Sequence, residues 1–290
     1  MIKNSAQTYR KNMVRGVFLF ILVTFIFRYY NHVLLHQLLQ PVIFKTDTDL
    51  AYWIYHIAGI SKLIVQNSTG AIIFDCLLIS LCIISIVYPS QRLSVIVFSV
   101  VYPLYFLSYN SFVTHHTGTM NGILLITFAF WFVKESTFKS LWEALRYFTL
   151  AVYSMAFIWK VFIGVSIFNF NQPEAIVKDN LSLYLYLNPN TLFTSVIYWF
   201  LQHPILLYAG YLFCVLIQGS MIIGFFTKKY DWLLSILIVF FHLSTYFFVD
   251  VCYFELLILN FTFIQPDASD RFMIMLKKGF YPLQKINMQV

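Results

Sequence analysis

The sequence predicts an all-α integral membrane protein: a polytopic bundle of about eight transmembrane helices with both termini in the cytoplasm. Of its 290 residues, 60% are hydrophobic and only 11% are charged, whereas soluble domains carry about 25% charged residues. The mean hydropathy of the chain is +0.75. Apolar runs close to the ~20 residues that cross a bilayer recur along the chain, and they lack the alternation of membrane β-strands.

Seven apolar segments are candidates for membrane spans. They are residues 14–35, 69–88, 92–112, 119–134, 144–169, 203–226 and 231–264. The last one is too long for one crossing and too short for two, so we expect two short half-spans that break near Asp250–Tyr253. The first resembles a signal peptide but lacks a small-residue cleavage site, which predicts an uncleaved first span.

Three stretches combine charges, aromatic residues and prolines, a mixture typical of the membrane–water interface. Residues 41–66 hold several tryptophan and tyrosine side chains beside acids and bases. Residues 171–190 read as a loop with one short helix. Residues 191–201 predict a short helix lying on the membrane.

The positions of Lys and Arg predict the topology, because these residues favour the cytoplasmic ends of spans. One side carries Lys3, Arg10, Lys11, Arg15, Arg92, Lys134, Lys139, Arg146, Lys228, Lys229, Lys277, Lys278 and Lys285, and the other mainly Lys45, Lys62 and Lys178. We therefore expect one transmembrane domain over residues 1–265, a basic cytoplasmic tail over 266–290, and residence in the plasma (inner) membrane. The bases lie at the ends of apolar runs rather than in a patch, which argues against nucleic acid as a partner.

Lys160 is the most informative polar residue, because an ionisable side chain inside a span is costly and marks a candidate functional site. Counted from Arg146 at ~1.5 Å per residue, it lies about 21 Å across the membrane. Tyr153, Ala156, Lys160 and Gly164 share one helix face by their spacing. A lysine in a water-poor pocket can serve as a general base. Snorkelling of the ammonium group to the interface is the alternative.

A second polar group lies in the last long apolar segment. His242, Tyr246 and Asp250 recur every four residues, which predicts one polar stripe on a helix. Such a stripe can orient a base or relay a proton, and a plain hydrogen-bonded seam between helices is the alternative. Glu255 follows as a candidate ion partner for a buried base.

Two histidines, His115 and His116, lie in the loop between the third and fourth apolar segments, shortly before Asn121. Adjacent histidines cannot face the same way on a helix, and no acidic ligand accompanies them, so we expect a loop over a cavity and no metal site. Arg28 and Asp75 lie towards the same side, and their mutual pairing would explain both. Sequence motifs of standard hydrolases, nucleotide-binding proteins and zinc proteases do not occur.

Three segments together resemble the HTTM family, the membrane domain shared with vitamin K-dependent gamma-carboxylase. They are His115-His116-Thr117 with Asn121-Gly122, then Tyr153-Ser-Met-Ala-Phe-Ile-Trp-Lys160, and Phe240-Phe241-His242 with the later Phe254-Glu-Leu-Leu-Ile-Leu. The likeness covers roughly residues 10–265.

The resemblance implies a carboxylase-like membrane enzyme, of the lyase class, in which Lys160 is the base that deprotonates a reduced, vitamin K-like quinone. His116 and His242 are implied as further catalytic cavity groups, with His115, Asn121, Tyr153, Tyr246, Asp250 and Glu255 in support. Two departures distinguish this chain from a full carboxylase. Val161-Phe-Ile-Gly164 lacks the tryptophan that the family shows after its lysine, and the sequence holds no counterpart of the large domain that follows the carboxylase's membrane part. In size the chain is closer to short bacterial members associated with maturing secreted peptides.

Three functions therefore stand open at the level of sequence. The first is a membrane enzyme that modifies a secreted peptide or a quinone-like lipid, working with a peptide substrate or a second membrane subunit. The second is a non-enzymatic partner in peptide export or immunity. The third is a small-solute transporter, which the absence of an internal repeat disfavours.

Overall fold

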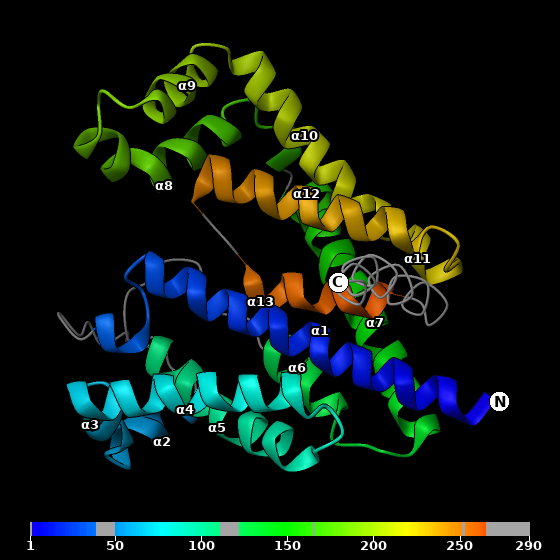
Figure 1. Ribbon diagram of the computed structural model, residues 1–290. Helices are drawn as coiled ribbons and strands as arrows, with labels where there is room; N and C mark the ends of the chain where they lie inside the picture. Colours follow the sequence, from blue (N-terminus) through cyan, green and yellow to red (C-terminus); the bar gives the residue numbers. More distant parts are fainter. Residues whose placement is uncertain (1, 39–49, 111–121, 165, 251–252, 265–290) are drawn as a thin grey trace, which may run out of the picture. The chain divides into compact units, whose positions relative to one another are not determined.

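The computed structural model describes residues 2–38, 50–110, 122–164, 166–250 and 253–264, and all regular structure in these residues is helical. The all-α class predicted from the sequence is confirmed (Figure 1). The predicted 266–290 tail and the loop with His115, His116 and Asn121 lie outside the described residues.

Within the described residues, six helical stretches are long and apolar enough to cross a membrane. They are Gln7–Gln37, Ser68–Val87, Arg92–Tyr109, Glu135–Ile163, Pro204–Phe226 and Asp231–Val249. Each overlaps one of the spans predicted from hydropathy, and together they identify the chain as an integral membrane protein. The total number of crossings and the cytoplasmic side of the termini stay predictions.

The predicted fourth span differs from the structure. Its described part forms α6, Gly122–Ala129, a helix of eight residues that covers about 12 Å. The helix ends in a turn in which Phe130 N–H and Trp131 N–H bond carbonyls only three residues back. The Phe130 carbonyl also accepts a hydrogen bond from Arg10 Nη2 at 2.7 Å, and this contact holds the chain off the helical path.

The break in the last apolar segment is confirmed, but the prediction of two short half-spans is wrong for the first part, because its 19-residue helix is long enough to cross a membrane. Helix α12 spans Asp231–Val249, and the chain continues in α13, Phe254–Leu257, and the 3-10 helix η4, Ile258–Phe263. Asp250 ends α12 with a φ of 53°, in the left-handed region that a regular helix cannot use.

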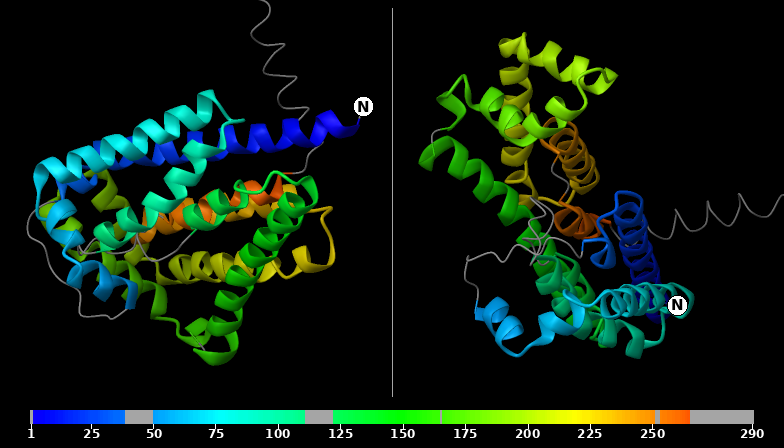
Figure 2. Two further views of the ribbon diagram at one scale, coloured as in Figure 1. Left: turned by 90° about the horizontal axis from the view of Figure 1, so that it is seen from below. Right: turned by 90° about the vertical axis from the view of Figure 1, so that its left-hand side faces the viewer.

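The chain divides into two compact units, each described by itself. The first comprises residues 1–113, 123–143 and 261–290, and the second comprises 114–122 and 144–260. The first holds the helices α1 (Ile2–Tyr30), η1 (Leu35–Gln37), α2 (Leu50–Ile57), α3 (Ile60–Ile64), α4 (Ser68–Val87), α5 (Arg92–Asn110), most of α6 and the start of α7 (Glu135–Ile158). Helix α4 packs against α1 on one side and α5 on the other (Figures 1 and 2).

The core of the first unit includes a column of aromatic rings on α5. Phe98, Tyr102, Tyr105 and Tyr109 recur every three or four residues, so they share one face, and their rings stack at 5.4–6.1 Å between centroids. The buried Arg28 guanidinium of α1 lies 4.6 Å from the Tyr109 ring centroid, a cation–π contact.

The second unit holds the rest of α7, the π-helix η2 (Trp159–Ile163), the 3-10 helix η3 (Ser166–Phe168), α8 (Gln172–Leu187), α9 (Leu192–Leu201), α10 (Pro204–Ser220), α11 (Ile223–Phe226), α12 and α13. Helices α8, α10 and α12 pack against one another, and α9 packs on α10 (Figure 1).

Residues 171–190 form more helix than predicted. Pro173 occupies the first turn of α8, where the missing proline N–H would have no partner within the helix. Val177, Leu181 and Leu185 follow at four-residue spacing. These three side chains are buried in a small core with Ile197 of α9 and Leu207 of α10. Burial of this stripe stabilises a full helix where the charges alone indicated a loop. The short helix predicted at 191–201 is confirmed as α9.

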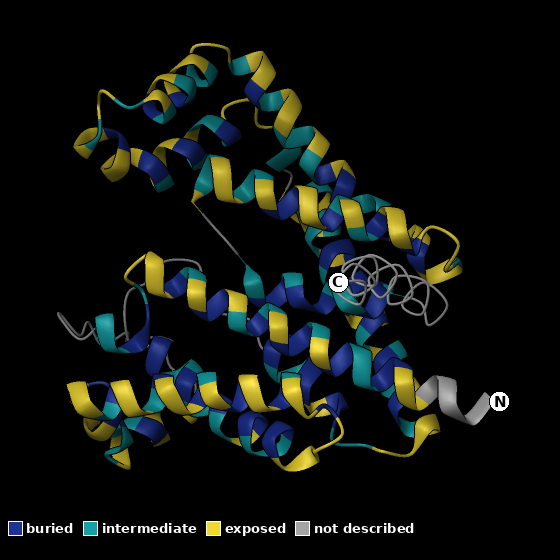
Figure 3. Cartoon of the chain, in the orientation of Figure 1, coloured by how far each residue is buried: buried dark blue, intermediate teal, exposed yellow. Residues whose placement is uncertain are grey.

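Many large apolar residues of the long helices are exposed, and Figure 3 shows where exposed residues lie along each described helix. On α1, for example, Leu19 and Val23 are each 53% exposed. On α10, Leu216 is 64% exposed. Exposure of this much apolar surface is unfavourable in water and favourable in lipid, which identifies the bilayer as a partner of these faces.

Candidate functional site

The second unit contains a cavity of about 660 Å³, within the usual range of ligand pockets, roughly 300–1,000 Å³. Its walls come from α7, η2, η3, α8, α9, α10, α12 and α13, and most of the side chains that line it are aliphatic or aromatic. From α7 and η2 the lining residues include Tyr153, Ala156 and Lys160, three of the four that helical spacing placed on one face. Gly164, the fourth, ends the π-helix and does not line the cavity.

Lys160 lies where α7 changes into a π-helix. Trp159–Ile163 form this wider turn, closed by a 2.6 Å hydrogen bond from Gly164 N–H to the Trp159 carbonyl. Single π turns inside α-helices occur frequently at functional sites. The irregular turn therefore supports Lys160 as a site residue on grounds separate from its charge.

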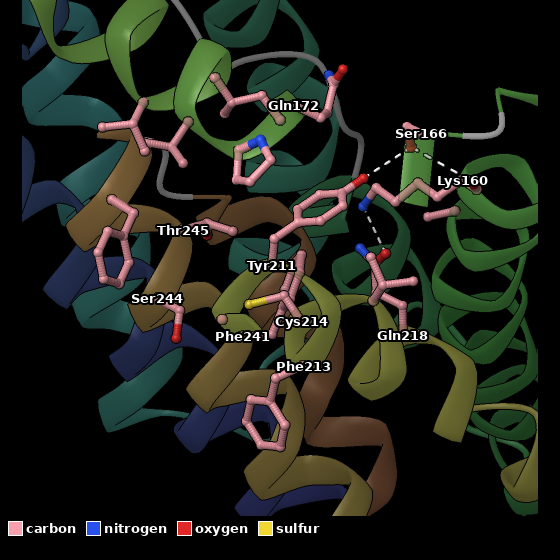
Figure 4. A pocket seen from close by; sticks show the side chains of 18 of the residues that line it. Lys160, Ser166, Gln172, Tyr211, Phe213, Cys214, Gln218, Phe241, Ser244 and Thr245 are labelled. Carbon is pink, nitrogen blue, oxygen red and sulfur yellow. Dashed lines mark hydrogen bonds between the residues drawn. The ribbon is translucent and has the colours of Figure 1, made fainter. Parts of the chain in front are cut away.

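The Lys160 ammonium has a neutral partner. Its Nζ donates a 2.7 Å hydrogen bond to Oε1 of the buried Gln218 on α10 (Figure 4). Among the residues that the structure describes, Lys160 makes no ion pair with a carboxylate. The amine is thus held in place by a group that does not fix it as a cation.

Gly219 allows α10 to approach α7 at this point. A Cβ atom added to Gly219 would lie 2.9 Å from ring carbons of Phe157 on α7, closer than carbon atoms approach without repulsion. The absence of a side chain at 219 brings the neighbouring Gln218 within reach of Lys160. The sequence did not single out either residue, and a glutamine next to a glycine inside a span is the signal that would have found them.

A second polar pair lies beside Lys160. Ser166 Oγ and the Tyr211 hydroxyl are 2.9 Å apart, and Ser166 Oγ also lies 3.5 Å from the Lys160 carbonyl oxygen (Figure 4). Lys160, Gln218, Ser166 and Tyr211 form a polar cluster in an otherwise largely apolar cavity. The cavity is thus amphipathic, with a largely apolar lining and a polar cluster around Lys160.

Tyr153 and His242 form a further polar pair. The Tyr153 hydroxyl lies 2.5 Å from His242 Nε2, and both residues are 2% exposed. Tyr153 lines the cavity, whereas His242 packs behind it, with its ring 6.0 Å from that of Tyr253. Burial raises the pKa of the Tyr253 phenol, which also lines the cavity.

The other residues predicted near this stripe have different surroundings. Tyr246 is 40% exposed, and Asp250 is exposed beyond the end of α12, where the left-handed backbone takes it off the helical repeat. Glu255 is buried in α13. Its backbone carbonyl lies directly against Gly122, since a Cβ atom added to that glycine would be only 1.4 Å from the carbonyl oxygen. His242, by contrast, is joined to the cavity wall by its hydrogen bond with Tyr153.

Two pairings in the structure differ from what the sequence suggested. Asp75 Oδ2 bonds His36, at 2.8 Å from Nδ1 and 3.0 Å from the backbone N–H, rather than Arg28. Arg146, which counted in the sequence as a marker of the cytoplasmic side, is buried in an ion pair with Asp231.

Comparison with protein-family models, curated proteins and solved structures finds no match to this chain. Its function is therefore inferred from the residues of the cavity.

Proposed function

We propose that this chain is a membrane enzyme of the kind the HTTM resemblance implies, with Lys160 as the general base on an amphipathic substrate in the cavity of the second unit. The substrate is a quinone-like lipid or a secreted peptide that the protein modifies or matures. The site of action is the plasma (inner) membrane, with a peptide or a second membrane subunit as partner. His242 supports the site through Tyr153.

One observation carries the proposal: the Lys160 amine bonds a neutral amide in a mostly apolar cavity. A carboxylate partner stabilises the protonated ammonium form, which cannot accept a proton. A neutral glutamine oxygen can accept a hydrogen bond from the amine or from the ammonium, so the amine can still take a proton from the substrate. A substrate that presents an acidic hydroxyl to Nζ would lose its proton to the amine, and the resulting oxyanion would pair with the ammonium.

The cavity also fits the kind of molecule that the resemblance names. A ring with an apolar chain finds aromatic and aliphatic walls, including Phe200, Phe213 and Phe241, and its oxygen finds hydrogen-bonding side chains at Lys160 and Tyr211. When bound, a reduced quinone would supply the acidic hydroxyl. The protein's own residues orient that hydroxyl, exclude water and receive its proton.

The experiment compares cells that express the wild type, Lys160→Arg or Lys160→Gln, with untargeted mass spectrometry of the lipid and secreted-peptide fractions. Arginine keeps the positive charge but does not release its proton near neutral pH. We expect a mass change that is present with the wild type and lost with both variants. Lys178→Arg, in an exposed pair with Glu174 on α8, is the matched control and should behave as the wild type.

A product that still forms with Lys160→Arg would show that the base role is wrong. If the lipid and secreted-peptide fractions of wild-type cells are the same as those of both Lys160 variants, the enzyme proposal fails. A non-enzymatic partner then becomes the better account of the polar cluster.

A further inference from the structure

The hydrogen bond between Tyr153 and His242 can be arranged in two ways, because a neutral imidazole carries its proton on one ring nitrogen only. With the proton on Nδ1, Nε2 is an acceptor and the Tyr153 hydroxyl must donate to it. With the proton on Nε2, the ring donates to the Tyr153 oxygen, and the tyrosine's own hydrogen is directed elsewhere. The 2.5 Å separation of the two atoms fits both arrangements.

The other ring nitrogen distinguishes them. His242 Nδ1 is buried and has no hydrogen-bond partner among the described residues. A buried N–H without an acceptor is rarer in proteins than a buried acceptor without a donor. The arrangement with the proton on Nδ1 would create such an orphan N–H, whereas the proton on Nε2 leaves only an unpaired acceptor. The environment of Nδ1 therefore favours the Nε2–H form.

In that form the Tyr153 hydroxyl accepts from His242 and keeps its own hydrogen for a second partner. Tyr153 is one of the residues that line the cavity, so a molecule bound there is the candidate for this second partner. Lys160 is seven residues further along the same helical stretch, about 10 Å at helical rise. The cavity then offers a fixed donor separate from the cluster around Lys160.

We propose that Tyr153 donates a hydrogen bond to an acceptor oxygen of the bound molecule, a carbonyl or an oxyanion, and that His242 is the positioning residue that holds Tyr153 as the donor. This deepens the proposed function and rests on it, because it names the chemistry of the substrate at the Tyr153 side of the same cavity. The donor role of Tyr153 does not require Lys160 to be a base.

The first test is nitrogen NMR of the histidine-labelled protein in lipid nanodiscs, which distinguishes protonated from unprotonated ring nitrogens. The His242 signals are identified by their loss in His242→Gln. We expect Nε2 to be protonated and Nδ1 not. A proton on Nδ1, or on both nitrogens, would overturn the proposal.

The second test uses a long-chain methyl ketone with an isotope-labelled carbonyl as the probe, because a ketone oxygen only accepts hydrogen bonds. In the wild type we expect an infrared carbonyl band shifted to lower frequency by the hydrogen bond. Tyr153→Phe should abolish the shifted band. Tyr198→Phe, on α9 and outside the cavity lining, should retain it as the matched control. Absence of the band in the wild type, or its persistence in Tyr153→Phe, would overturn the proposal.

Three further variants separate this proposal from the one on Lys160 and test the positioning role of His242. Lys160→Gln should keep the shifted band. If Lys160→Gln loses the band and Tyr153→Phe keeps it, the ketone bonds Lys160, and the donor role of Tyr153 is refuted while the proposal on Lys160 stands. His242→Gln offers an amide N–H near the position of Nε2–H and should retain the shift, whereas His242→Leu should weaken it. Equal bands in these two variants would contradict the positioning role of His242.

Discussion

Arg146 bonds Asp231 at two points inside the second unit. The Arg146 Nε lies 3.0 Å from Oδ2 and Nη2 lies 2.6 Å from Oδ1. The two side chains are 2% and 3% exposed. Nη2 also donates to the Gly224 carbonyl at 2.9 Å. The pair joins the middle of α7 to the first turn of α12, where an acidic residue also compensates the helix dipole.

Removing one member of this pair should destabilise the protein strongly, because the other charge is left buried. We expect Arg146→Ala to lower the free energy of unfolding by about 3–5 kcal/mol, measured by denaturation in detergent micelles. Lys139→Ala is the matched control on the same helix: its 2.6 Å pair with Glu135 is exposed, and its loss should change stability by less than about 1 kcal/mol. Equal effects of the two substitutions would contradict the assignment.

Two glycines of α10 should respond in opposite directions to the same substitution. Gly219→Ala places a methyl group 2.9 Å from the Phe157 ring and should destabilise the protein by about 1–3 kcal/mol through overpacking. Gly210→Ala meets no heavy atom within 4 Å and should stabilise it by up to about 1 kcal/mol, since alanine favours the helix. Unfolding in detergent checks both, and a destabilised Gly210→Ala would refute the open space assigned to that position.

Filling the cavity from Gly210 should reduce ligand binding without disturbing the fold. Gly210 lines the cavity and its Cβ direction is open, so a leucine there should occupy the space that a bound molecule needs. We expect Gly210→Leu to lower the hydrogen-bonded fraction of the labelled ketone severalfold. Ala209→Leu, at the neighbouring exposed position that does not line the cavity, should leave that fraction unchanged.

His56 should make the first unit sensitive to acid. Burial lowers the pKa of its imidazole below the ordinary value of 6.5, so the folded state favours the neutral ring. The contribution of the neutral His56 ring to the free energy of unfolding is complete above about pH 6.5 and is lost as the pH falls through the lowered pKa of the folded state. Between these two pKa values the free energy of unfolding changes by at most about 1.4 kcal/mol per pH unit. Unfolding curves of the wild type and His56→Gln should converge or cross on acidification. Curves that stay parallel would count against this contribution.

The positions of the helices could be predicted from the sequence because apolar length and helix-breaking residues are local properties. The six long apolar helices follow the hydropathy pattern, and the break after Val249 lies where the excess length of the last segment indicated it. The eight-residue helix α6 escaped prediction because its end depends on a contact from Arg10, which is 120 residues distant in the chain.

The candidate site was predictable in part. Lys160, Tyr153 and His242 stood out because an ionisable or polar side chain is conspicuous in an apolar run. Gln218, Gly219, Ser166 and Tyr211 did not stand out, because neutral polar and small residues are ordinary inside membrane helices. Their relevance appears only when α10 is seen beside α7.

The sequence by itself determined that this chain is a helical membrane protein and which charged groups are expensive to keep within it. The tertiary structure decided their partners: Lys160 bonds Gln218 across 58 residues, Arg146 bonds Asp231 across 85, and Tyr153 bonds His242 across 89. The physical reason is that hydropathy is read from neighbouring residues, whereas a hydrogen bond requires two helices to present particular faces to each other at close approach. That choice is made by packing, through side chains such as Phe157 and the missing side chain of Gly219.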